Sequence, residues 1–104
     1  MNFYHITTPE NWDKFQNKDY YEAESLHTEW FIHGSYWEQL DDTLRLYYKG
    51  ISKVILIEID PSELTSKLVI EKSREGNLFP HIYGAINKSA IVQVEERLLQ
   101  NEIV

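Results

Sequence analysis

The sequence predicts a small α+β domain in which strands outnumber helices. Short runs of β-branched and aromatic residues recur along the 104 residues, which is typical of strands. Two helical patterns, each with a start signal, fall in the first half of the chain. The second half is mostly strand-like segments separated by Gly and Pro. We therefore expect one α+β domain over residues 1–104, with two helices in its N-terminal half.

The chain begins with a predicted strand and a short helix. Phe3–Thr7 is aromatic and β-prone, which predicts a strand. Thr8 followed by Pro9 is typical of a helix start, with Pro in the first turn. Thr7 with Glu10 also has the spacing of a capping box, which leaves Thr7 and Thr8 as alternative caps. Residues 17–29 show no clear period and predict a long loop with room for one helical turn.

A second strand and the strongest helical pattern follow this loop. Trp30–His33 predicts the strand, and Ser35 with Glu38 has the spacing of a capping box. The apolar positions within residues 37–48 fall at i, i+3, i+7, i+10 and i+11, which predicts an amphipathic helix. Gly50 stands where a C-terminal capping glycine is expected.

Strands are predicted through most of the second half. Lys53–Asp60 is apolar at consecutive positions, as in a central strand that is buried on both faces. Further strands are predicted over Leu68–Glu71, around residues 78–83 and over Ala90–Glu95, with a frayed tail from Leu98 onward.

Composition narrows the classes of function. The formal net charge is -7, so the surface repels nucleic-acid phosphates and anionic lipids, and nucleic acid is disfavoured as a partner. The absence of Cys excludes disulfides and thiolate chemistry. No apolar run approaches the about 18 residues of a membrane span, and the first residues lack a signal-peptide pattern. We therefore expect a cytoplasmic protein with no membrane partner.

Three histidines are the candidate catalytic residues. His5, His33 and His81 each lie in or beside an apolar, strand-like segment. Alternate residues of a strand share a face, so His5 and His33 are expected to point into one cleft. Imidazole transfers protons near neutral pH. The competing interpretation is that each is a partly buried histidine bonded to a backbone carbonyl. No local pair such as H-x-x-x-H occurs, so no metal is expected.

Four further residues are candidate ligand-binding residues. Ser35 lacks the G-x-S-x-G context of a nucleophile and fits a helix cap better, although a helix start beside a histidine also suits an anionic group. Glu71, at a strand end, either orients a ribose hydroxyl, acts as a base or is simply a solvated acid. Phe79 and Tyr83 flank His81; Tyr83 offers a flat face and a hydroxyl for stacking, and the alternative is that both are core aromatics.

Three blocks of the sequence together resemble a known family. Residues 4–7 (YHIT), 31–35 (FIHGS) and 78–84 (LFPHIYG) are similar to signature blocks of the small bacterial domain-of-unknown-function family 952. Residues 56–61 and the strand ending in Glu71 also match its pattern, so the resemblance covers about residues 3–95. Many relatives carry Cys where this chain has Gly34, which implies that no thiol is required there and that glycine is tolerated in the packing.

The resemblance implies a fold and a ligand. The family is of uncharacterised activity, and its fold is thought similar to the ADP-ribosyltransferase superfamily, a split, mainly antiparallel β core that grips NAD. On this basis His5 contacts a ribose, His33 lies near the nicotinamide, and His81, Tyr83 or Glu71 completes the site. The expected ligand is NAD, as a substrate, or an ADP-ribose derivative.

The activity itself stays open at this point. Transfer of an ADP-ribosyl group would pass through an oxocarbenium-like state at the ribose carbon, to an unknown acceptor. No glutamate that would activate an acceptor stands out in the sequence. The alternative is a non-catalytic domain that binds a small ligand or another protein.

Overall fold

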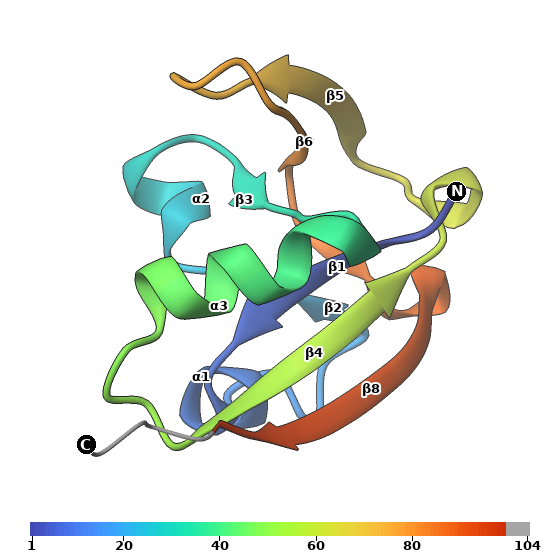
Figure 1. The fold of residues 1–104 in the computed structure, drawn as a ribbon. Coiled ribbons are helices and arrows are strands. Elements are labelled where there is room, and N and C mark those ends of the chain that lie inside the picture. Colours follow the sequence, from blue (N-terminus) through green and yellow to red (C-terminus); the bar gives the residue numbers. More distant parts are fainter. Residues whose placement is uncertain (100–104) are drawn as a thin grey trace.

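The computed structural model describes residues 1–99 and shows an α+β fold with antiparallel sheets (Figure 1). The strands are β1 (Phe3–Thr7), β2 (Tyr20–Tyr21), β3 (Ile32–His33), β4 (Lys53–Ile59), β5 (Lys67–Lys72), β6 (Leu78–Tyr83), β7 (Ile86–Asn87) and β8 (Ile91–Leu98). The helices are α1 (Pro9–Asp13), α2 (Ser25–Thr28) and α3 (Leu40–Tyr47), with 3-10 turns at Trp37–Gln39, Pro61–Glu63 and Lys88–Ala90. None of the helices within these residues is long and apolar enough to cross a membrane.

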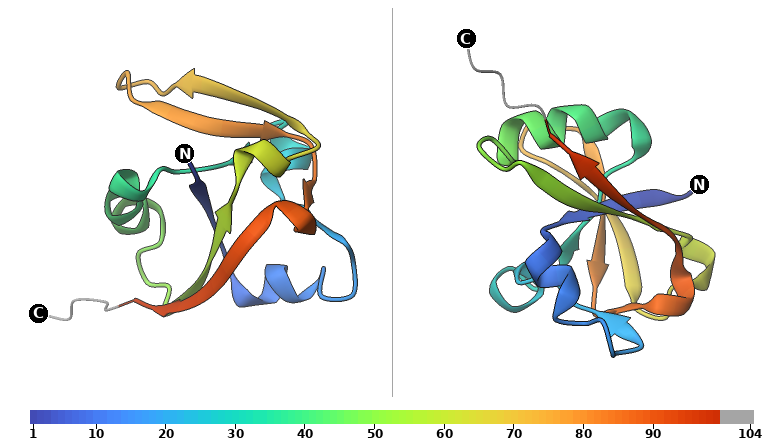
Figure 2. Two further views of the ribbon diagram at one scale, coloured as in Figure 1. Left: turned by 90° about the vertical axis from the view of Figure 1, so that its right-hand side faces the viewer. Right: turned by 90° about the horizontal axis from the view of Figure 1, so that it is seen from below.

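The strands form three sheets in the described part of the chain. Their orders are β1-β4-β8, β2-β7 and β3-β6-β5, and every pair is antiparallel. Figure 2 shows the β5–β6 hairpin standing apart from the β1-β4-β8 sheet, while α3 packs beside the latter. The predicted α+β class with mainly antiparallel strands is confirmed.

β4 is the central strand, as predicted, because its alternate residues enter two different cores. Ile55, Ile57 and Ile59 face the larger core, which also holds residues from all three sheets. Val54 and Leu56 face a smaller core under α3. Because β4 is apolar at consecutive positions, one of its faces packs in the larger core and the other in the smaller core. The main partners in the larger core are Phe3, Tyr21, Ile32, Ile82 and Ile86, and those in the smaller core are Ile6 and Leu40.

The predicted helix over residues 37–48 is divided, and Ser35 does not cap it. A 3-10 turn precedes α3, and the side chain of Gln39 accepts a hydrogen bond from the Tyr36 N–H at 2.9 Å. Ser35 instead exchanges two backbone hydrogen bonds of 2.7 Å with Tyr4. This bridge to β1 holds Ser35 in an extended conformation before the helix starts. Tyr48 is the C-cap of α3, so Gly50, with φ 80, lies one position beyond the C′ position that was predicted for it.

The loop predicted over residues 17–29 contains more structure than expected. It holds the single helical turn α2 and the two-residue strand β2, which pairs with β7. A two-residue strand is too short to show a period in the sequence. The following strand is shorter than predicted, since Trp30 has a left-handed φ of 77 and stands outside β3. β8 extends through Leu98, and the rest of the predicted tail, residues 100–104, lies outside the described residues.

Gly34 is a packing requirement in this chain. A Cβ atom at Gly34 would lie 2.8 Å from Cδ2 of Phe3 and 3.0 Å from Cγ of Pro80. Phe3 and Pro80 are both fully buried, so neither ring can move aside without disturbing the core. Glycine is therefore required at position 34 by the packing of Phe3 and Pro80 around it.

We expect Gly34→Ala to lower the free energy of unfolding by about 1–3 kcal/mol, because the added methyl overpacks the core. Urea denaturation measures the change. The matched test is a double-mutant cycle with Phe3→Leu, which shortens the ring that the methyl meets. If Gly34→Ala costs the same stability with and without the Phe3→Leu substitution, the clash with this ring is contradicted.

Candidate functional site

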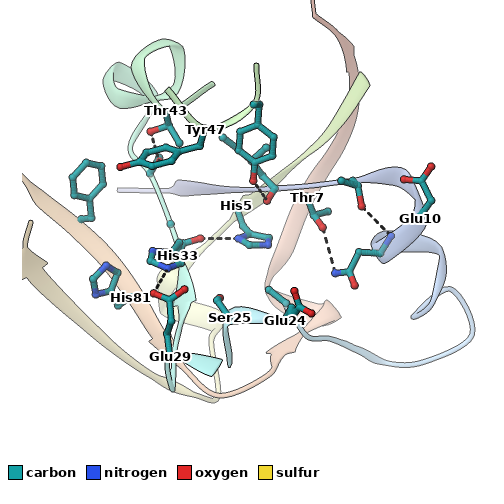
Figure 3. Close-up of a pocket in the computed structure, with 18 of the residues that line it drawn as sticks. His5, Thr7, Glu10, Glu24, Ser25, Glu29, His33, Thr43, Tyr47 and His81 are labelled. Carbon is teal, nitrogen blue, oxygen red and sulfur yellow. Dashed lines mark hydrogen bonds and ion pairs between the residues drawn. The ribbon is translucent and has the colours of Figure 1, made fainter. Parts of the chain in front are cut away.

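An open cleft of about 920 Å³ lies where β1, α1, α2, β3 and α3 meet (Figure 3). It gathers residues from the three sequence blocks that carried the family resemblance. Five of the predicted site residues line it, namely His5, His33, Ser35, Phe79 and His81. Glu71 and Tyr83 do not line the cleft, but both belong to the hydrogen-bond network of His81.

His5 forms a buried support beneath the cleft. Its Nδ1 lies 2.6 Å from the carbonyl oxygen of His33, and its Nε2 lies 3.0 Å from the hydroxyl of Tyr21. A carbonyl can only accept, so Nδ1 donates and Nε2 accepts from Tyr21. Burial lowers the pKa of His5 to about 4, so the ring is neutral near pH 7. For His5 the geometry matches the interpretation of a buried histidine bonded to a backbone carbonyl.

A polar network extends from His5 along the cleft floor. The Tyr21 hydroxyl accepts from the side-chain amide of Asn11 at 2.9 Å, and burial raises the pKa of Tyr21 to about 12. Asn11 also donates to Thr7 Oγ1 and to the Glu22 carbonyl, both at 3.3 Å. These bonds tie α1 and β2 to β1, so the floor is held by contacts within the chain.

His33 and His81 stand side by side on the cleft wall. They are direct cross-strand partners on β3 and β6, with ring centroids 5.5 Å apart and planes at 80°. Phe31 stacks on His81 with centroids 4.0 Å apart and planes at 21°, and meets His33 edge-on at 4.8 Å. The ring of Phe31, just before β3, thus joins the two cleft-lining histidines in one aromatic cluster.

Each of these two histidines is held by a carboxylate. His33 Nε2 lies 3.1 Å from Glu29 Oε1, and His81 Nδ1 lies 2.7 Å from Glu71 Oε1. The Tyr83 hydroxyl also donates to Glu71 Oε1, at 2.6 Å. Hydrogen bonds from Tyr83 and His81 lower the pKa of Glu71, which keeps it a carboxylate. Glu71 and Tyr83 thus act through His81, and Tyr83 is not a core aromatic but a partly exposed one.

Ser35 is buried under α3 and has no histidine partner within residues 1–99. Its hydroxyl lies 3.3 Å from that of Thr43, which in turn donates to the Gln39 carbonyl at 3.0 Å. Both Ser35 and Thr43 line the cleft. The arrangement offers hydroxyl groups to a ligand, but no Ser–His pair for nucleophilic catalysis.

The charged residues of the cleft were not predicted from the sequence. Glu10, Glu24 and Glu29 line it, and Lys14 is the one Lys or Arg among the residues that the structure places there. Glu10 could have been noticed as the acid in the first turn of α1. Glu24 and Glu29 lie in the segment without a period, which gave no signal for their position. Within residues 1–99, no group of three or more His, Cys, Asp or Glu side chains is arranged to hold a metal ion.

Fold and site together define a small α+β domain with split antiparallel sheets and a histidine-lined cleft. The family model described as "Protein of unknown function (DUF952)" matches residues 6–94, so the chain belongs to this family. Among curated proteins, none matches this sequence.

Solved structures of the protein CC0527 from Caulobacter crescentus are similar to this chain. Its crystal structure has a TM-score of 0.83 and 27% sequence identity, covering 96% of this chain and 87% of that one. A double-mutant form gives a TM-score of 0.82 at 26% identity, with the same shares covered. The solution NMR structure gives 0.72 at 25% identity, covering 90% of this chain and 82% of that one. The likeness therefore extends over nearly the whole chain.

The buried His5 predicts a loss of stability in mild acid. Its folded pKa of about 4 lies below the ordinary value of 6.5, so the unfolded chain takes up a proton first as the pH falls. The contribution of the neutral His5 ring to the free energy of unfolding is complete above pH 6.5 and declines as the pH falls toward 4. Unfolding at pH 5 should be easier than at pH 7 by roughly 2 kcal/mol from this group.

Urea denaturation at the two pH values measures this effect. His5→Asn removes the titrating group while its amide can still donate to the His33 carbonyl, so the variant should lose most of the pH dependence. His27→Asn, at an exposed histidine outside the cleft, should retain it. If the free energy of unfolding of His5→Asn falls between pH 7 and pH 5 as much as that of the unchanged chain, the assignment of this pH dependence to His5 is contradicted.

Proposed function

We propose that this domain binds NAD or an ADP-ribose derivative in the histidine-lined cleft, with transfer of the ADP-ribosyl group as the associated reaction. The observation that carries the proposal is the convergence of His5, His33, Ser35 and His81 on one cleft. They come from three segments far apart in the sequence, the same segments that resemble the family blocks.

The size and lining of the cleft support a ligand of this kind. Its volume of about 920 Å³ lies within the range of roughly 300–1,000 Å³ for small-molecule sites. The wall combines flat rings at Phe79 and His81 with hydroxyls at Ser35 and Thr43. Rings suit a nicotinamide or adenine, and hydroxyls with nearby carboxylates suit a ribose.

The charge of the cleft favours one end of such a ligand. Three carboxylates, those of Glu10, Glu24 and Glu29, stand against the single ammonium of Lys14. The nicotinamide ring of NAD carries a positive charge, and the ribose carbon becomes positive when the bond to the ring nitrogen breaks. Fixed carboxylates stabilise both. The diphosphate is best placed near Lys14, at the C-terminal end of α1.

A second candidate function is binding without turnover. It is favoured by His5, whose two ring nitrogens are both used within the chain and whose lowered pKa of about 4 keeps it from donating a proton near neutral pH. A site whose deepest histidine is structural can hold a ligand through its remaining side chains. Both candidates use the same cleft and differ in whether nicotinamide is released.

Thermal melting with added ligands tests the binding common to both candidates. A ligand at about 100 times its dissociation constant adds about 2.7 kcal/mol of stability, which raises the Tm of a domain of this size by more than about 8 °C. We expect such a shift with NAD, and a smaller one with ADP-ribose, which lacks the cationic ring. His33→Ala should lose most of the shift while keeping the ligand-free Tm, because its side chain is about half exposed.

The matched control is His27→Ala, which removes another histidine paired with a glutamate but outside the cleft. It should keep the full shift with NAD. Release of nicotinamide, followed by chromatography, then separates transfer from simple binding. Absence of a shift with NAD, ADP-ribose and nicotinamide would contradict the proposal.

A further inference from the structure

The carboxylate partners of His33 and His81 fix which nitrogen of each ring carries the hydrogen. A carboxylate can only accept, so Glu29 holds the hydrogen of His33 on Nε2, and Glu71 holds that of His81 on Nδ1. Tyr83 donates to Glu71 as well, which keeps Glu71 an acceptor. In the neutral ring the other nitrogen then bears a lone pair. This lone pair is at Nδ1 of His33 and at Nε2 of His81.

These two lone pairs are open to a ligand. Neither nitrogen has a hydrogen-bond partner among residues 1–99. Both rings line the cleft, and Figure 3 shows them next to each other on its wall. The two rings are in edge-to-face contact, with centroids 5.5 Å apart, so one small group that lies in the cleft against both rings can reach both. Glu29 and Glu71, each hydrogen-bonded to one of the rings, add negative potential.

A site of two acceptors backed by two carboxylates selects for N–H donors and against anions. A carboxylic acid in its ionised form would leave both lone pairs unpaired and would stand near two like charges. A carboxamide has the same planar shape and presents two N–H donors on one nitrogen. Phe31 stacks on His81 with planes at 21°, which helps to hold the plane of the imidazole that presents the acceptor.

We propose that the His33–His81 pair recognises a planar N–H donor group through His33 Nδ1 and His81 Nε2, with Glu29 and Glu71 as positioning residues. This inference rests on the proposed function for its ligand, which makes the group the carboxamide of the nicotinamide ring. It specifies which end of NAD lies at the β3–β6 wall and why an amide is needed there.

The direct test compares NAD with nicotinic acid adenine dinucleotide, which carries a carboxylate in place of the carboxamide. Calorimetric titration of the full chain should give NAD at least about tenfold tighter binding, the equivalent of one to two lost hydrogen bonds. His81→Phe and His33→Phe keep a flat ring and remove the acceptor, so each should reduce this ratio several-fold. His27→Phe, outside the cleft, should leave it unchanged.

A second measurement needs no ligand at all. Long-range ¹H–¹⁵N spectra of the imidazole rings report which nitrogen is protonated. Neutral His81 should carry its hydrogen on Nδ1 and neutral His33 on Nε2, and Glu71→Gln should relax the preference of His81, because an amide can donate as well as accept. Hydrogen on Nε2 of His81 in the unchanged chain would overturn the inference.

The outcomes separate the inference from the proposed function. Equal binding of the two dinucleotides, or a ratio unaffected by His81→Phe, overturns the acceptor pair and leaves NAD binding standing. Where NAD fails to bind, the proposed function falls, and benzamide against benzoate serves as the probe. Tighter binding of benzamide than of benzoate, lost in His81→Phe, then supports the acceptor pair. Equal binding of benzamide and benzoate overturns the acceptor pair as well.

Discussion

The imidazole of His5 touches all three sheets of the structure, and the cleft depends on this contact. The ring belongs to β1, its Nδ1 donates to the backbone of β3, and its Nε2 accepts from Tyr21 in β2. Beside it, Tyr4 and Ser35 exchange backbone hydrogen bonds of 2.7 Å. Removing the ring would leave the His33 carbonyl without this donor and the Tyr21 O–H without an acceptor, although the Tyr21 oxygen would still accept from Asn11. Leaving buried donors and acceptors unpaired costs more than the bonds themselves contribute. One neutral side chain therefore fixes how the sheets stand around the cleft.

Buried and cleft-facing side chains alternate along β3 and β6, and the cleft-facing ones form one wall of the cleft. Ile32 and Ile82 are direct partners and fully buried, whereas the next pair, His33 and His81, faces the cleft. A slip of β3 by one residue would bury His33 and expose Ile32, so burial of the Ile32–Ile82 pair enforces the register of the histidine pair. His33 serves twice, because its carbonyl anchors β3 to His5 while its side chain stands at the cleft.

The sequence predicted the parts of this design that show local patterns. Consecutive apolar residues in β4 identified the central strand. The strand contexts of His5 and His33 predicted that both point into one cleft, and both line it. The sequence could not predict that His5 is structural, since that depends on Tyr21, sixteen positions away in the chain, on a strand too short to show a period. Ser35 likewise had the spacing of a helix cap, but its backbone pairs with that of Tyr4 in β1 instead. Long-range partners decided each of these cases.

The electrostatic design of the cleft differs from that of sites built for phosphate. Such sites gather backbone N–H groups, arginines or several lysines around the anion. Here three carboxylates and one lysine line the cleft, and the whole chain carries a formal charge of -7. In a ligand with both a cationic ring and a diphosphate, the carboxylates attract the ring, whereas the diphosphate has one lysine to pair with among the lining residues. Binding is then governed by the ring and ribose, so the specificity of the domain is expected to lie at the histidine pair and its carboxylates.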